Sequence, residues 1–96
     1  MIAQATLNAR LDAAAAAGRE AEVEALLAQG APADAADADG DTAMMKAVRT
    51  DRPTIVRMLR RYGASPDRRN RAGESARDIA AGIDDPALSR ALGPDE

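Results

Sequence analysis

The chain has 96 residues and a formal net charge of −3 at pH 7, and it contains neither Cys nor His. This length fits one domain, and the missing residue types exclude disulfides, thiolate chemistry and the commonest general base and metal ligand. The small net charge implies no nucleic-acid partner, and no apolar run approaches the roughly 18 residues of a membrane span, so we expect a cytoplasmic protein.

The apolar composition predicts a helical protein with a thin core. Leu, Ile and Val are scarce and Phe is absent, whereas Ala is by far the commonest residue. Disordered chains share such a low aliphatic content, but they also carry a high net charge, which is absent here. Ala is the best helix former and lets helices approach closely.

The first predicted helix covers residues 7–17 and ends at Gly18, and a second continues to Gly30, which suits a left-handed stop. Residues 31–41 are rich in Pro, Asp and Gly and are predicted to be turn. The apolar residues expected on the inner faces of these helices are Leu7, Leu11, Val23, Leu26 and Leu27.

The same pattern then restarts. Thr42 is a good N-cap for a short helix, and Pro53 falls in the first turn of the next helix, where its missing N–H is not required. Gly63 stops that helix, residues 64–74 are again turn, and Ser75 caps a third start. The second helix of this unit is predicted to fill its inner face with Ile55, Val56, Leu59 and Tyr62. A last short helix opens at Asp85-Pro86.

Two stretches of the chain repeat each other at a spacing of about 33 residues, which we call the repeat period. Gly30-Ala31 returns as Gly63-Ala64, and Gly40-Asp41-Thr42-Ala43 returns as Gly73-Glu74-Ser75-Ala76. Self-similarity at this period is typical of stacked repeat proteins, which present extended surfaces for binding.

A two-helix unit of this length, with Gly- and Asp-bearing turns, resembles the ankyrin repeat. The resemblance rests on Asp37, Gly40, Thr42, Ala43, Met44, Ile55, Val56, Leu59, Gly63, Ala64 and Asp67. It implies an all-α, helix-turn-helix solenoid with extended turns between units, forming a single domain over 1–96. Within it we expect an N-terminal capping unit at 7–36, a complete repeat at 37–69 and a C-terminal capping unit at 70–93.

The chain departs from the family pattern in two informative places. The family's Thr-Pro-Leu-His is Thr42-Ala43-Met44-Met45 here, so the His whose hydrogen bonds tie neighbouring repeats together is missing. The Gly between paired helices is kept at Gly18 but replaced by Asp51. Tetratricopeptide-like helical pairs are the alternative architecture, but they lack the long Asp/Gly turn that occurs twice here.

Neither a metal site nor an active site is predicted. The acidic turn around Gly40 suggests a calcium loop, but the first and last ligand positions would then be Ala35 and Lys46. A solvated turn, whose Asp side chains accept hydrogen bonds from nearby backbone N–H groups, explains the cluster. Solvated carboxylates are poor acid–base catalysts, so we expect no enzyme and no cofactor.

Charge is distributed unevenly along the chain. Residues 1–45 carry eight acids and two bases, residues 46–77 carry ten bases and three acids, and residues 78–96 carry five acids and one base. Three interpretations of the Arg-rich band 46–77 stay open: a solvated face, a surface for an acidic protein, or a site for nucleic acid or another polyanion. The flanking acids would repel phosphate and disfavour the last of these.

The resemblance implies that partners lie against the turn tips and the shorter helices, on the concave side. The candidate contact residues are therefore Asp39, Asp41, Lys46, Arg49, Arg69, Arg71 and Glu74. We expect no specific role for Arg57, Arg60 and Arg61, which fall on the second helix. The predicted function is protein–protein interaction by a small binding, adaptor, regulatory or inhibitory protein. The expected partner is an acidic or dipolar protein, with no membrane contact and at most weak self-association; a module that regulates an associated enzyme is a further alternative.

Overall fold

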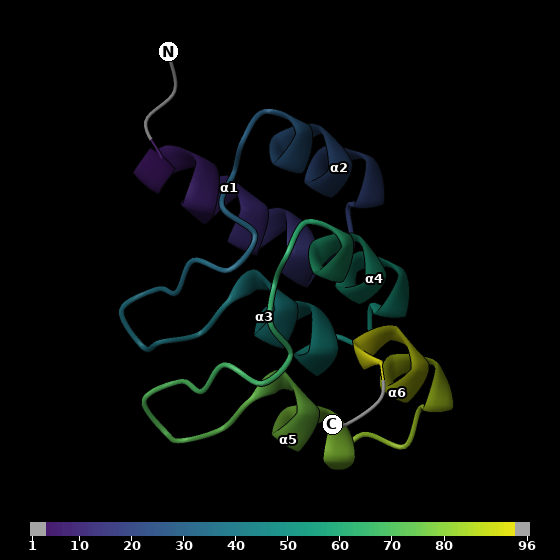
Figure 1. The fold of residues 1–96 in the computed structure, drawn as a ribbon. Coiled ribbons are helices and arrows are strands. Elements are labelled where there is room, and N and C mark those ends of the chain that lie inside the picture. Colours follow the sequence, from purple (N-terminus) through teal and green to yellow (C-terminus); the bar gives the residue numbers. More distant parts are fainter. Residues whose placement is uncertain (1–3, 94–96) are drawn as a thin grey trace.

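The computed structural model describes residues 4–93, in which six helices form three hairpin-like pairs (Figure 1). The helices are α1 (Gln4–Ala17), α2 (Glu20–Ala28), α3 (Ala43–Arg49), α4 (Pro53–Arg61), α5 (Ala76–Ala81) and α6 (Pro86–Leu92). No strand occurs among these residues, and a single antiparallel bridge joins Ala36 to Thr42. The all-α helix-turn-helix prediction is confirmed.

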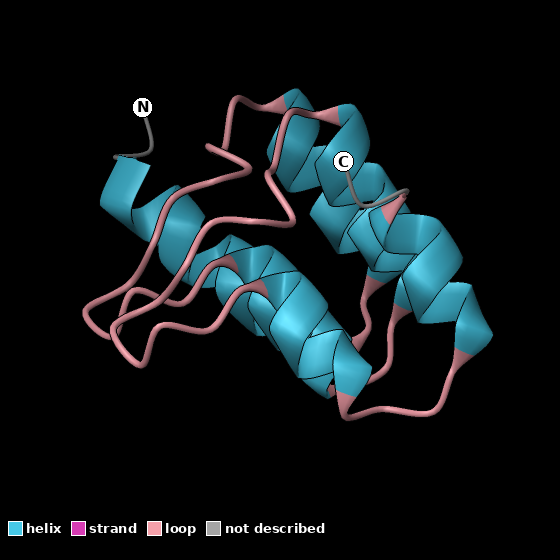
Figure 2. Ribbon diagram, turned by 60° about the horizontal axis from the view of Figure 1, so that its bottom comes forward, coloured by secondary structure: helices cyan, strands magenta, loops and turns pink. Residues whose placement is uncertain are grey.

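The pairs stack side by side, so that α1, α3 and α5 make one layer and α2, α4 and α6 make the other (Figures 1 and 2). Two long turns project from the α1–α3–α5 side, and we name residues 31–41 finger 1 and residues 64–74 finger 2. Finger 1 joins α2 to α3, and finger 2 joins α4 to α5. None of the described helices is long and apolar enough to cross a membrane.

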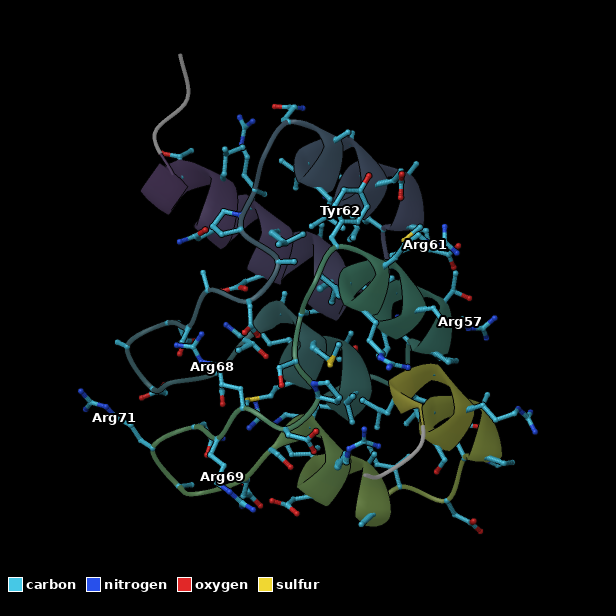
Figure 3. The ribbon with its side chains drawn as sticks, viewed as in Figure 1. Arg57, Arg61, Tyr62, Arg68, Arg69 and Arg71 are labelled. Carbon is cyan, nitrogen blue, oxygen red and sulfur yellow. The ribbon has the colours of Figure 1, made fainter. Side chains whose placement is uncertain are left out.

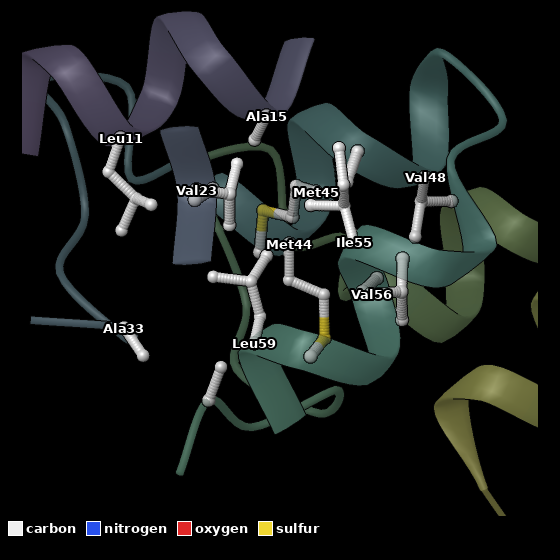
Figure 4. Packing of buried hydrophobic residues seen from close by; sticks show 14 of the residues in the cluster. Leu11, Ala15, Val23, Ala33, Met44, Met45, Val48, Ile55, Val56 and Leu59 are labelled. Carbon is white, nitrogen blue, oxygen red and sulfur yellow. The ribbon is translucent and has the colours of Figure 1, made fainter. Parts of the chain in front are cut away.

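The core lies between the two layers (Figure 4). Its largest fully buried side chains include Leu11, Met44, Met45, Ile55, Leu59, Leu88 and Leu92. Buried alanines such as Ala15 and Ala47, both 0% exposed, let neighbouring helices approach closely. Met45 stands where the family pattern has its His, and this position is filled by a buried apolar side chain.

One prediction about the core is wrong, because Tyr62 is 41% exposed. It is the C-cap of α4, beyond the turn that carries Ile55, Val56 and Leu59 inward. Its hydroxyl donates to Glu24 Oε1 of α2 at 3.2 Å, so the ring lies across the outside of the helical layer.

The helix ends follow local side-chain chemistry. Thr42 accepts a hydrogen bond from the Met45 N–H at 3.3 Å, and Ser75 accepts one from the Asp78 N–H at 3.2 Å, which confirms both predicted caps. Asp51 has a φ of 56°, so it adopts the left-handed conformation for which the equivalent Gly18 is suited. The first helix begins at Gln4, three residues before its predicted start.

Candidate interaction site

Each finger is held in shape by a polar side chain at its base. In finger 1, Asp37 Oδ1 accepts hydrogen bonds from the Asp39 and Asp41 N–H groups at 2.9 and 3.0 Å. In finger 2, Asn70 Oδ1 accepts one from the Glu74 N–H at 3.0 Å. The acidic stretch is therefore the side-chain-stabilised turn that the sequence predicts, and the described residues contain no cluster of three acids placed to hold a metal ion.

The two fingers are also bonded to each other. The Arg71 N–H donates to the Asp39 carbonyl oxygen at 3.0 Å, and Asn70 Nδ2 donates to Asp41 Oδ1 at 2.9 Å. A Cβ atom on Gly40 would lie only 2.9 Å from the Arg71 nitrogen, so the backbones approach as closely as glycine permits. The fingers therefore form one continuous surface.

Lys46 lies behind finger 1, where it is used internally. Its Nζ contacts Asp12 Oδ2 at 3.2 Å and Asp37 Oδ2 at 2.8 Å, which ties α1, finger 1 and α3 together. Burial would lower the pKa of Lys46, but its bonds to the two carboxylates outweigh that effect and leave the pKa raised. Burial raises the pKa of Asp12, whereas the bond from Lys46 lowers the pKa of Asp37. Lys46 therefore stabilises the fold through these two ion pairs, and only 24% of its side chain is exposed.

Two of the candidate arginines are paired within the molecule. The Arg49 guanidinium donates two hydrogen bonds to the Asp41 carboxylate, at 2.7 and 3.2 Å, and these bonds lower the pKa of Asp41. Arg69 donates to the Gly73 carbonyl oxygen at 2.7 Å and to Asp78 Oδ2 at 3.0 Å, so it points toward α5 (Figure 3).

Three candidates keep exposed side chains that bond to no other described residue: Asp39, Arg71 and Glu74. Arg71 projects from the tip of finger 2 (Figure 3). A hollow of about 310 Å³ lies between the fingers, lined by Asp39, Asp41, Arg49, Asn70, Arg71, Ala72 and Glu74. The structure thus brings five of the seven candidates to one hollow and leaves Lys46 and Arg69 outside it.

Asn70 is the residue that sequence reasoning missed. It bonds both within finger 2 and across to Asp41, so it sets the distance between the fingers. The repeat register could have identified Asn70, because it stands one repeat period after Asp37 and performs the same turn-stabilising role.

A family model described as "Ankyrin repeats (many copies)" matches residues 11–60, which is more than half of the chain. No curated protein matches the chain. Ankyrin repeats are generally protein–protein interaction modules and are typically without enzymatic activity. The match agrees with the three stacked helix pairs and the two long turns, and the chain therefore belongs to the ankyrin repeat family.

Proposed function

We propose that the protein binds a protein partner through the hollow between its two fingers. The observation that carries this proposal is the arrangement of charge around the hollow. Asp41 and Arg49 neutralise each other at 2.7 Å, whereas the exposed side chains of Asp39, Arg71 and Glu74 form no hydrogen bond or ion pair with a described residue. An adaptor and an inhibitor would both use this surface.

The remaining charges favour a dipolar partner. Two carboxylates, on Asp39 and Glu74, accept a basic side chain, and the guanidinium of Arg71 accepts an acidic one. Because the fingers are bonded to each other, little ordering is needed on this side of the interface, and that lowers the free-energy cost of binding. Opposite charges on neighbouring fingers also fix the direction in which a partner lies across them.

The alternative function, polyanion binding through residues 46–77, is less well supported. Five of the ten basic residues in this band form ion pairs with carboxylates: Lys46, Arg49, Arg68, Arg69 and Arg77. A polyanion would have to compete with those pairs. Its binding would weaken steeply and log-linearly with salt concentration.

The same proposal takes 7–36 and 70–93 as capping units around a complete repeat at 37–69. Leu11, Met44 and Arg77 occupy equivalent positions in successive units, each one repeat period after the last. The first two are buried apolar side chains, whereas Arg77 donates to the Gly93 carbonyl oxygen at 2.7 Å and to Asp67 Oδ1 at 2.8 Å. At this position the last unit thus bonds a polar side chain to the end of α6, where the earlier units bury an apolar one.

The test is a charge swap across the fingers, Asp39→Arg with Arg71→Glu. It leaves the net charge unchanged and removes no bond between described side chains, so the fold and the melting temperature should stay the same. We expect the swap to abolish capture of the partner that the wild-type protein retains in affinity purification and mass spectrometry. Unchanged capture by the folded variant would remove the fingertips from the binding site.

A further inference from the structure

The arginines of the basic band divide into a paired group and an unpaired group. The residues of the band that form no ion pair with a described carboxylate are Arg52, Arg57, Arg60, Arg61 and Arg71. Arg71 belongs to finger 2, and the other four lie on α4 or immediately before it. Unneutralised positive charge is therefore concentrated on one helix, in the layer that faces away from the fingers.

Two of these four side chains have local structural contacts. Arg52 lies over Gly18, where an added Cβ would come within 2.7 Å of its Nε atom. Arg60 reaches the end of α6 and donates to the Ala91 carbonyl oxygen at 3.5 Å. The other two, Arg57 and Arg61, are exposed and lie one helical turn apart. Figure 3 shows both pointing away from the body of the molecule.

The α4 sequence does nothing to neutralise Arg57 and Arg61. Like charges four residues apart on a helix destabilise it, and α4 contains no acidic residue that could offset the repulsion. In finger 2, by contrast, Arg68 and Arg69 each have a carboxylate within reach. A repulsive pair with no counter-charge on its own helix is suited to an external anionic partner.

Tyr62 adds an aromatic side chain at the Arg61 end of this surface, where α4 ends. It is the chain's only aromatic residue, it follows Arg61 directly, and it is 41% exposed. The hydrogen bond to Glu24 holds its ring in place. Tyr and Arg are the residue types enriched where protein interfaces concentrate their binding energy.

We propose that Arg57, Arg61 and Tyr62 form a second interaction surface, here named the α4 face, which binds an acidic protein segment. Two carboxylates one helical turn apart on the partner would match the two guanidinium forks, each of which can bind a carboxylate through two hydrogen bonds. The apolar part of the Tyr62 ring would pack against the partner beyond the carboxylate that Arg61 binds.

The surroundings of the α4 face favour a short acidic segment over nucleic acid. Glu20, Glu22 and Glu24 lie on the neighbouring α2, and Asp51 lies at the turn that precedes α4. A long polyanion that crossed α4 would meet these carboxylates and be repelled, whereas a segment of two or three turns would stay over the arginines.

Figure 3 shows Arg57 and Arg61 on the side of the molecule opposite Arg71, the tip residue of finger 2. One chain could therefore hold two partners at once, with the dipolar partner at the fingers and the acidic one at α4. This arrangement would give the protein the geometry of an adaptor, and it makes the two surfaces separable by mutation.

The proposal is tested with a labelled helical peptide that carries glutamates at i and i+4, and with its glutamine counterpart, by fluorescence anisotropy at low ionic strength. The wild-type protein should bind only the glutamate peptide. The variant Arg57→Gln with Arg61→Gln should weaken binding about tenfold or more, because it removes both bidentate contacts. Its melting temperature should not fall, since a repulsive pair is lost.

The matched control is Arg10→Gln with Arg90→Gln, which removes the same charge from exposed positions on α1 and α6. We expect this control to bind the glutamate peptide within about twofold of wild type, since only general attraction is reduced. Equal losses in both variants, no binding by wild type, or equally tight binding of single-stranded DNA would each overturn the proposal. Loss of partner capture at the fingers would not, because the α4 variant leaves that surface intact.

Discussion

At the scale of single residues, two glycines with the same backbone conformation allow a matched test of how the fingers meet. Gly40 and Gly73 have φ values of 78° and 80°. An alanine at either position incurs the left-handed backbone penalty, about 1 kcal/mol. Only at Gly40 would the new Cβ collide, 2.9 Å from the Arg71 nitrogen and 3.0 Å from the Asn70 Cα atom.

We therefore expect Gly40→Ala to lower the free energy of unfolding by about 1–3 kcal/mol more than Gly73→Ala does, as measured by urea denaturation. Gly40→Ala should also weaken partner capture, because the fingers must separate to admit the methyl group. Equal losses of stability would mean that the two fingers move apart freely and do not form one surface.

The range of each contact along the chain explains which predictions from the sequence succeed. The N-caps at Thr42 and Ser75 depend on local chemistry, so the sequence identifies them. The hydrogen bond from Tyr62 to Glu24 joins residues 38 positions apart, and no local pattern reports that contact. The Lys46–Asp12 bond, across 34 residues, is hidden for the same reason.

At the scale of elements, α5 depends on its cap. It has only six residues, too few to be stable alone, and a capping box joins Ser75 and Asp78 at its start. Asp78 Oδ2 accepts from the Ser75 N–H at 3.0 Å and also from Arg69 at 3.0 Å. The hydrogen bond from the Ser75 backbone contributes most to lowering the pKa of Asp78, and the bond from Arg69 lowers it further. The same carboxylate thus begins the helix and anchors finger 2.

The lowered pKa of Asp78 predicts the sign of a pH dependence. Because the folded pKa lies below the unfolded one, the carboxylate contributes stability above an ordinary value of about 4, and this is lost as the pH falls through the folded pKa. Asp78→Asn should therefore melt below wild type at neutral pH, and the difference should shrink in acid. The control Asp84→Asn, on the exposed turn before α6, should show no difference at either pH; a pH-independent loss in Asp78→Asn would contradict the ionic role.

The candidate site is predictable from the sequence only as far as its elements. The repeat register identifies both fingers and places the seven candidate residues near the tips and the inner helices. It does not reveal that Lys46 and Arg69 are bonded to Asp37 and Asp78, because those pairs depend on how each finger folds back on its helix. The side chains left exposed at the hollow emerge only after the internal pairs are known.

At the scale of the whole molecule, the stacking of repeats makes Ala47 a measure of how closely the helix pairs fit. Ala47 is 0% exposed on α3, the helix that packs against α1, α4 and α5. A leucine there has no free volume and should lower the free energy of unfolding by about 1–3 kcal/mol. The matched control is Ala81→Leu on α5. Ala81 is exposed and lines a hollow of about 270 Å³ with Leu92, so this change should stay within about 0.5 kcal/mol.

The Ala47 variant also tests whether the scaffold sets the site. Arg49 lies two residues after Ala47 on the same helix and pairs with Asp41 in the lining of the hollow, so a displaced α3 should disturb the finger surface as well as the core. We therefore expect Ala47→Leu to weaken partner capture at a temperature where it is still folded, whereas Ala81→Leu should not. Urea denaturation and capture can be measured on the same preparations. An Ala47→Leu variant with an unchanged unfolding midpoint would contradict the close stacking of the three helix pairs. A variant that is destabilised but captures its partner normally would show that the finger surface does not depend on that stacking.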